Sequence, residues 1–191
     1  ALEALVTEAY FSKFWAETGL AGKNFHRFAK ARHHPDIPAT KAVRSYGAFV
    51  HSLQARFDRR KDSPHFAAAD RLLSEKAGQV ALARGAPLIA YSYYAAAAFR
   101  MMEGSGLPRV LFQVHPNGKY LRELFQREIE KVPEAKASLM EETEMSPLFA
   151  HNDETFAQAD AVICASSFTH HSLAAAGSKA PAHVVGYGVD L

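Results

Sequence analysis

The stretch from Asp160 to Asp190 constrains the fold of this chain more than any other. Residues 162–165 form an apolar run too short for a helix, and Ser166 and Ser167 can cap the helix that follows, because a serine hydroxyl accepts a hydrogen bond from an orphaned helix N–H. Gly177 suits the end of that helix, and Val184 begins a second apolar run. A strand, a capped helix and a strand of these lengths predict a βαβ unit, the building block of parallel sheets.

The rest of the chain repeats this alternation of short apolar runs and helical periodicity. Ser63-Pro64 opens a long predicted helix that Gly85 ends, and a second predicted helix follows His115. Strands are predicted at residues 5–10, 43–49, 88–91 and 110–114. We therefore predict an α/β fold, a single Rossmann-like domain over residues 1–191 with a parallel sheet flanked by helices.

Composition agrees with a folded domain and narrows its partners. The 48% hydrophobic and 22% charged residues are typical of a globular protein, and no apolar run approaches the ~20 residues that span a bilayer. A net charge of +2 is too small to indicate nucleic acid. Residues 21–84 nevertheless hold thirteen Lys and Arg against five Asp and Glu, whereas residues 119–160 hold five against ten. The sequence therefore predicts one basic and one acidic region of surface.

A resemblance to a known family adds to this interpretation. The segment running from Ala159-Asp160 through Ser166 and Thr169 to Gly188-Val189-Asp190 resembles the end of the N-terminal domain in the group 1 family of retaining glycosyltransferases, which have the two-domain GT-B architecture. Tyr187 stands where that family often has Asn. The runs VLFQVHPNG and LVTEAYF extend the resemblance over most of the chain.

The resemblance implies that this chain is the N-terminal, acceptor-side half of a GT-B fold. The nucleotide-sugar-binding C-terminal domain, and the first strand of the usual N-terminal domain, would lie outside these residues. The implied reaction moves a hexose from a UDP- or GDP-sugar to a hydroxyl acceptor with retention, in the synthesis of a glycan, lipid-linked glycan or polysaccharide. No cofactor would be bound by this half, and the chain alone would be catalytically inactive.

The same resemblance gives expectations about partners and location. The missing donor-binding domain and a sugar or lipid-linked acceptor are the implied partners, and the implied location is cytoplasmic. The basic segment 23–34 has two interpretations. It is either a solvated cationic face, or a surface that docks on the anionic inner face of the membrane, where each Lys or Arg contributes about 1 kcal/mol.

Candidate site residues follow from where ligands bind in open α/β sheets, which is beyond the carboxyl ends of the strands. Three such ends are predicted, and their polar and aromatic residues are candidates for binding an acceptor or substrate: Ser92, Tyr93 and Tyr94; His115, Asn117, Gly118 and Lys119; and Ser166. Asn117 or Gly118 would open a helix whose free N–H groups and dipole favour an anion. Aromatic faces and hydroxyls suit sugars, although tyrosines more often serve as packing.

His115 is the candidate catalytic residue, and two interpretations of it stay open. As the last residue of a predicted strand, it should project its imidazole into the crevice, and the resemblance implies that a histidine here contacts the transferred sugar. Alternatively, His115 caps its strand through a backbone hydrogen bond. Lys119 could contact a phosphate, although a solvated surface role is more common for a lysine.

Other kinds of site find little support in the sequence. His33-His34 and His170-His171 are adjacent pairs whose side chains diverge, and Cys164 is the single cysteine, so we expect no metal site. No Gly-x-Ser-x-Gly elbow and no strand-linked Gly-x-Gly-x-x-Gly turn is present, which disfavours a serine hydrolase and a nucleotide-binding oxidoreductase. The alternative to the transferase is a non-catalytic module with a Rossmann-like fold that binds a glycan or a protein.

Overall fold

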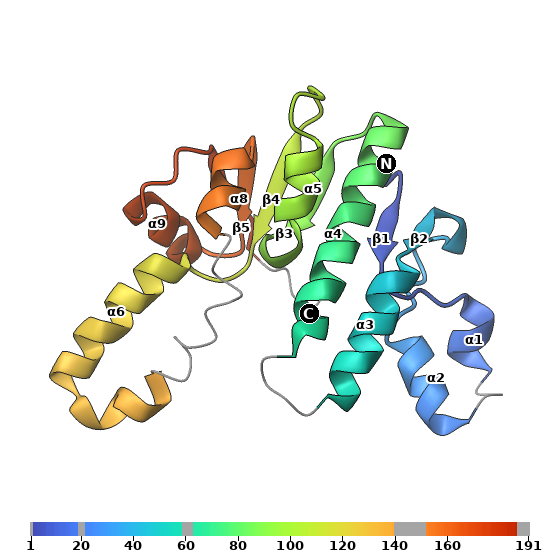
Figure 1. Cartoon of the computed structure of the whole chain (residues 1–191), viewed down its shortest axis with the longest axis horizontal. Helices are drawn as coiled ribbons and strands as arrows, with labels where there is room; N and C mark the ends of the chain where they lie inside the picture. The colour runs from blue at the N-terminus through green and yellow to red at the C-terminus, as the bar shows by residue number, and fades with distance from the viewer. Residues whose placement is uncertain (1, 19–21, 59–62, 140–151, 187–191) are drawn as a thin grey trace. The chain divides into compact units, whose positions relative to one another are not determined.

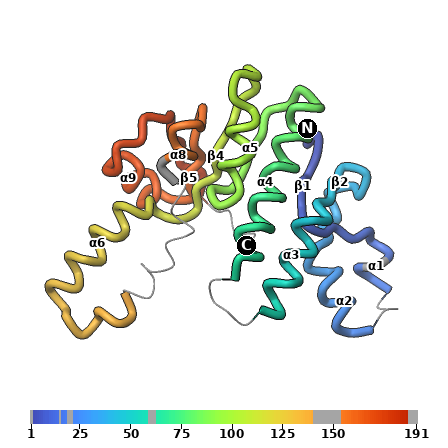
Figure 2. The backbone as a smooth tube through the Cα atoms, viewed as in Figure 1, coloured from blue at the N-terminus to red at the C-terminus, as the bar shows by residue number. Residues whose placement is uncertain are grey.

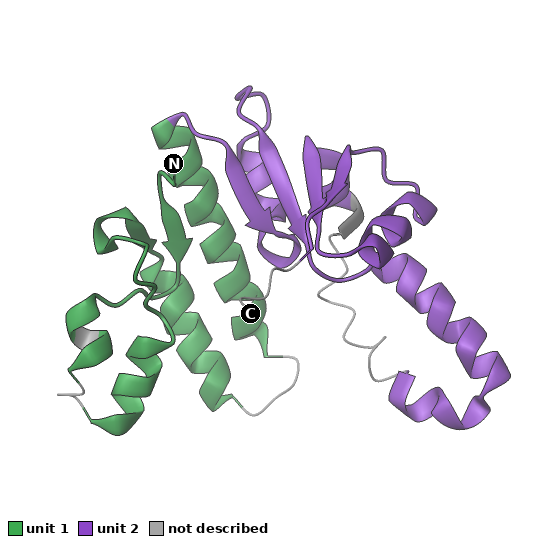
Figure 3. Ribbon diagram, turned by 180° about the vertical axis from the view of Figure 1, so that it is seen from behind, with its two compact units in different colours: residues 1–84 green, residues 85–191 purple. Residues whose placement is uncertain are grey.

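The computed structural model describes residues 2–18, 22–58, 63–139 and 152–186 (Figure 1). The chain divides into two compact units, unit 1 over residues 1–84 and unit 2 over residues 85–191 (Figure 3). The prediction of a single domain over 1–191 stays a prediction.

Unit 1 combines a small parallel sheet with four α-helices among its described residues. Strand β1 (Leu5–Thr7) pairs in parallel with β2 (Ala42–Arg44). The helices are α1 (Lys13–Glu17), α2 (Lys23–Lys30), α3 (Tyr46–Phe57) and α4 (Pro64–Arg84), with a 3-10 turn, η1 (Ala39–Lys41), before β2. The long helix predicted between Ser63-Pro64 and Gly85 is thus confirmed.

The strand predicted at residues 43–49 is wrong over most of its length. The chain leaves β2 after Arg44, and α3 begins at Tyr46. A short apolar run cannot be assigned to a strand or a helix by periodicity alone. The face that α3 buries carries the small residues Ala48, Ser52 and Ala55 at a helical spacing, which a pattern of large apolar residues does not reveal.

The packing of unit 1 includes an aromatic cluster. The Phe11 ring lies edge-on to the Phe25 and Phe28 rings of α2, with centroids 5.4 and 5.5 Å away. The ring centroids of Phe28 and of Phe49 on α3 are 6.2 Å apart. The Arg32 guanidinium carbon lies 4.0 Å from the Phe28 ring centroid. The apolar face of α2 therefore packs inside unit 1, and its basic residues remain on the outside.

Unit 2 is built on a four-stranded sheet in which all strands are parallel. Its strands β3 (Leu88–Tyr91), β4 (Arg109–Gln113), β5 (Ala161–Cys164) and β6 (Ala182–Val184) lie side by side in chain order. In the backbone trace of Figure 2, β4 and β5 are labelled next to each other. The α/β, Rossmann-like class predicted from the sequence is confirmed. So is the predicted βαβ unit, although β6 begins two residues before the expected Val184.

The helices of unit 2 join these strands and bury one face of the sheet. They are α5 (Ala96–Met101), α6 (Gly118–Lys131), α8 (Asn152–Gln158) and α9 (Ser167–Ala175), with 3-10 turns η2 (Ser92–Tyr94) and η3 (Pro133–Ala135). Leu111 and Val162 on the strands are fully buried, as are Phe99 and Leu173 on α5 and α9. Side chains alternate along a strand, and Tyr91, next to the buried Ala90, is 50% exposed.

One expectation falls on residues that the structure does not describe, namely the Gly188-Val189-Asp190 segment of the family resemblance. Among the described residues, no helix combines the length and the apolar character that crossing a bilayer requires.

Candidate functional site

All candidate site residues lie at one edge of the sheet of unit 2. Because β3, β4 and β5 are parallel neighbours, their carboxyl ends meet at the same edge, which we call the carboxyl edge. Ser92, Tyr93 and Tyr94 form the turn η2 after β3; His115, Asn117, Gly118 and Lys119 follow β4; and Ser166 follows β5. The fold thus gathers residues that are up to 74 positions apart in sequence, from 92 to 166.

His115 lies two residues beyond the end of β4, and it is exposed. Its ring centroid is 5.8 Å from that of Tyr93, with the two planes tilted by 44°. The backbone carbonyl of His115 accepts a hydrogen bond from Gln113 Nε2 at 2.6 Å. Among the described residues the imidazole itself makes no hydrogen bond, so strand capping by the ring is not observed.

The tyrosines provide an aromatic surface next to this imidazole. Tyr93 and Tyr94 are half-buried, and their rings meet edge to face with centroids 6.5 Å apart. Burial raises the pKa of the Tyr93 phenol, which therefore keeps its proton and can donate a hydrogen bond at neutral pH. Ser92 is only 6% exposed, so it contributes to the packing of the turn.

The N-terminus of α6 is capped by the side chain of Asn117. Asn117 Oδ1 accepts hydrogen bonds from the backbone N–H groups of Lys119 at 2.9 Å and Tyr120 at 3.3 Å. Two of the N–H groups that the sequence predicts to be free for an anion are therefore already satisfied. Asn117 is 1% exposed and Gly118 is buried, whereas Lys119 is exposed and makes no ion pair with any described residue.

Ser166 caps α9, as the sequence predicts. Its Oγ accepts a hydrogen bond from the backbone N–H of Thr169 at 3.1 Å and lies 3.0 Å from Thr169 Oγ1. Thr169 Oγ1 in turn donates to the carbonyl of Val114 at 3.2 Å. The Ser166 hydroxyl thereby joins a network that fixes the end of β4 next to the start of α9.

The roles of two residues that shape the carboxyl edge, Gln113 and Thr169, were not predicted from the sequence. Gln113 holds the carbonyl of His115, and Thr169 holds that of Val114. Gln113 is 1% exposed, and its Oε1 has no hydrogen-bond partner. A single polar residue inside the apolar run 110–114 was the available signal, because a strand buries such a side chain only where a partner holds it.

In the described part of the chain, no group of three or more His, Cys, Asp or Glu is placed to hold a metal ion. Cys164 is buried, and desolvation raises the pKa of its thiol, which therefore stays protonated. In unit 1, however, His51 and His65 meet with their Nδ1 atoms 3.0 Å apart, a pair that sequence spacing did not suggest.

Comparison with known proteins gives no relative for this chain. No family model, no curated protein and no solved structure matches it.

Proposed function

We propose that this chain is the acceptor-side half of a retaining glycosyltransferase with GT-B architecture. The observation that carries the proposal is the exposed His115 imidazole at the carboxyl edge, 5.8 Å from the ring of Tyr93. Ligands of open α/β sheets bind at this edge. The motif resemblance along the chain agrees with this assignment.

In this proposal the aromatic surface binds a sugar. Tyr93 and Tyr94 would pack against the apolar C–H face of a pyranose, and the Tyr93 phenol would donate a hydrogen bond to one of its hydroxyls. His115 would contact the transferred hexose through a ring nitrogen. Gln113 positions His115 through the backbone, because its amide holds the His115 carbonyl.

The developing negative charge of the reaction would be stabilised mainly outside this chain. A nucleotide diphosphate leaving group needs several cationic or N–H groups around it. At the carboxyl edge, Lys119 is the exposed lysine among the described candidates, and two N–H groups of α6 are taken by Asn117. A second, donor-binding domain that carries a UDP- or GDP-sugar is therefore part of the proposal, and we expect these 191 residues alone to show no turnover.

Kinetics of a single variant test the proposed role of His115. In the protein joined to its donor-binding half, His115→Ala should lower kcat about 10²-fold or more, because a contact to the reacting sugar is lost. The melting temperature should not change, since the imidazole is exposed. The matched control is His183→Ala, an exposed histidine on β6.

The outcome also separates the transferase from the alternative. Unchanged kcat would remove His115 from the reaction, and a collapse in stability would show that it is structural. A non-catalytic module that binds a glycan or a protein would bind through the same edge yet turn over no nucleotide sugar in any form. The absence among the described residues of a second acidic or basic side chain hydrogen-bonded to His115 is the observation that favours this alternative.

Attachment to a membrane surface is a further part of the proposal. Residues 1–84 contain fourteen Lys and Arg against eight Asp and Glu, a formal net charge of +6. Lys23, Arg27 and Lys30 of α2 are exposed. A lipid-linked acceptor at a cytoplasmic membrane face would be reached most directly by an enzyme that docks there through such a surface.

A further inference from the structure

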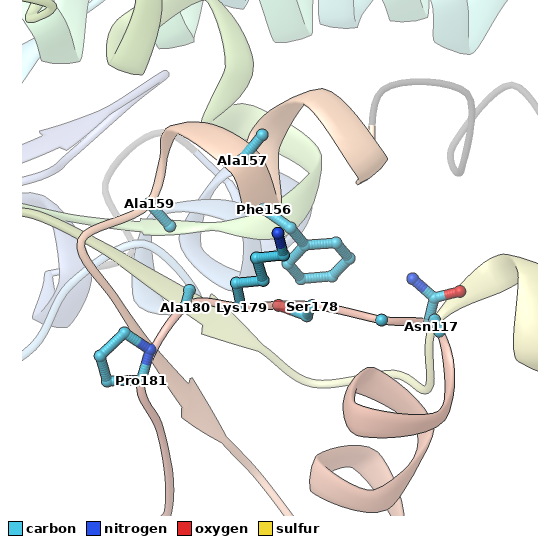
Figure 4. A pocket seen from close by; sticks show the side chains of 10 residues that line it. Asn117, Phe156, Ala157, Ala159, Ser178, Lys179, Ala180 and Pro181 are labelled. Atoms are coloured by element: carbon cyan, nitrogen blue, oxygen red, sulfur yellow. The ribbon is translucent and has the colours of Figure 1, made fainter.

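We infer that unit 2 holds a second binding site, which takes a small apolar acid. The site is a pocket of ≈ 530 Å³ between the end of α8, the loop from α9 to β6, and the residue that caps α6 (Figure 4). Its volume lies within the range typical of small-molecule sites. Asn117 is the one lining residue that is also a candidate at the carboxyl edge, and its side chain is buried; the proposed function depends on His115 and Tyr93, which do not line this pocket, so this inference does not rest on it.

The walls of the pocket are mostly apolar and small. Phe156 supplies an aromatic ring, and alanine methyl groups and Pro181 supply most of the remaining surface. Phe156 is 6% exposed, so its ring is held by packing. A wall of this kind suits a hydrocarbon group such as a phenyl ring or a branched chain.

Two polar groups of the pocket have unused hydrogen-bonding capacity. Asn117 is 1% exposed, and its Oδ1 is committed to the two N–H groups of α6. These bonds fix the orientation of the amide, so Nδ2 is turned away from the helix, toward the pocket (Figure 4). Ser178 Oγ is buried and has no partner. An unpartnered buried polar atom costs free energy, which a bound acceptor would recover.

The charge of the pocket selects an anion. Lys179 is the one charged residue among the described lining residues, and it makes no ion pair with any described residue. An amide N–H, a hydroxyl and an ammonium group together offer donors to a carboxylate. A neutral ligand would leave the ammonium uncompensated, and a cation would be repelled by it.

The loop that carries these groups is already ordered. Gly177 adopts a φ of +82°, the left-handed conformation that ends α9. The N–H of Gly177 donates to the carbonyl of Ala174, and that of Ser178 donates to the carbonyl of Leu173. Binding would therefore require little loop ordering, which favours affinity for a small ligand. The ligand class that fits is an aromatic or branched-chain monocarboxylate.

Phenylacetate is the probe for this site, and phenylacetamide is its neutral isostere. In an NMR titration of the full chain, phenylacetate should shift the Asn117 side-chain amide and the Ser178 backbone amide saturably, with Kd on the order of 1 mM for a ligand of this size. Phenylacetamide should bind at least about tenfold more weakly, because it cannot pair with Lys179.

Single substitutions test whether Lys179 and Ser178 bind the ligand. Lys179→Met should weaken phenylacetate binding about tenfold or more, whereas Lys136→Met, at another exposed lysine of unit 2, should leave it unchanged. Ser178→Ala should weaken binding without lowering stability, since its hydroxyl has no partner to lose. The inference is overturned if no saturable shift is observed, if both probes bind equally well, or if Lys179→Met binds phenylacetate like the unmodified chain.

Discussion

Asp70 carries a carboxyl group whose ionised form is unfavourable in the position that the fold gives it. It lies half-buried on α4, and its pKa is raised to about 6, first by desolvation and then by the negative charge of Glu8. Ser52 Oγ donates a hydrogen bond to Glu8 Oε1 at 2.6 Å, so Glu8 is fixed near this position. Ionised Asp70 therefore destabilises the folded chain at neutral pH.

The sign of this effect gives a prediction for stability. A folded pKa above the unfolded value of 3.8 means that the contribution of Asp70 is greatest below pH 3.8 and is lost as the pH rises through about 6. Asp70→Asn should raise the free energy of unfolding at neutral pH by about 1 kcal/mol, after allowing for solvent screening of a half-exposed group. Urea unfolding across this pH range measures it.

The control for Asp70 is an exposed carboxyl group. Glu134→Gln on η3 should leave both the stability and its pH dependence unchanged. Loss of stability in Asp70→Asn at neutral pH, with an unchanged slope between pH 3.8 and about 6, would show that the carboxylate is favourably bound after all.

The sequence identified the positions of the site residues better than their roles. The rule that ligands bind beyond strand ends placed His115 and Tyr93 at one edge, because it depends only on the order of the elements. The direction of a side chain depends on contacts across the fold, so the sequence could not reveal that the Asn117 amide nitrogen faces the pocket. The hydrogen bond from Gln113 Nε2 to the His115 carbonyl could not be predicted from the sequence for the same reason.

At the scale of elements, α3 and α4 are joined by a pair of histidines. His51 Nδ1 and His65 Nδ1 lie 3.0 Å apart, so one hydrogen bond with one shared proton connects the two helices. The two residues are fourteen positions apart, and only the antiparallel packing of the helices brings them together. Sequence spacing alone therefore gave no indication of this pair.

Removing one of the two imidazoles should break this connection. His51→Ala leaves His65 Nδ1 without the partner 3.0 Å away, so the free energy of unfolding should fall by about 1 kcal/mol. His51→Gln, which keeps a donor and an acceptor, should lower it by less, and His183→Ala on β6 is the control. Urea unfolding measures the three variants. Equal loss of stability in His51→Ala and His183→Ala would contradict this account.

The elements of the sheet were predicted well where capping or glycine signals marked them. Ser166 and Gly177 bound α9 as expected, and Pro64 and Gly85 bound α4. In the region 43–49, Ser45 stands at the N-cap position of α3 but makes no side-chain cap, and the segment beyond Arg44 was assigned to the wrong element type. Helix caps can be predicted from sequence because they involve residues only a few positions apart. A short apolar run does not by itself distinguish a strand from a helix.

At the scale of the whole molecule, charge is divided between the two units. Residues 1–84 carry a formal net charge of +6, and residues 85–191, with eight Lys and Arg against twelve Asp and Glu, carry −4. The net charge of +2 for the whole chain is the sum of these two opposite contributions. The basic unit is the one that would be attracted to an anionic surface.

Vesicle binding measures that attraction. The chain should bind vesicles rich in phosphatidylserine, and replacing Lys23, Arg27 and Lys30 with Gln should weaken binding about 100-fold at low salt, at about 1 kcal/mol for each charge. Replacing Arg122, Arg127 and Lys136 of unit 2 should have little effect. Equal loss from the two triple variants, or equal binding to zwitterionic vesicles, would indicate that α2 is only a solvated face.

The most direct test of the central proposal is an NMR titration of the full chain with a panel of sugars and nucleotide sugars, observed at the ring resonances of His115, Tyr93 and Tyr94. The account predicts that at least one sugar shifts these three rings together and saturably, and that His183 on β6 does not respond. If every sugar leaves the three rings unchanged, or if the response appears only at residues away from the carboxyl edge, the assignment of this edge to sugar binding is contradicted.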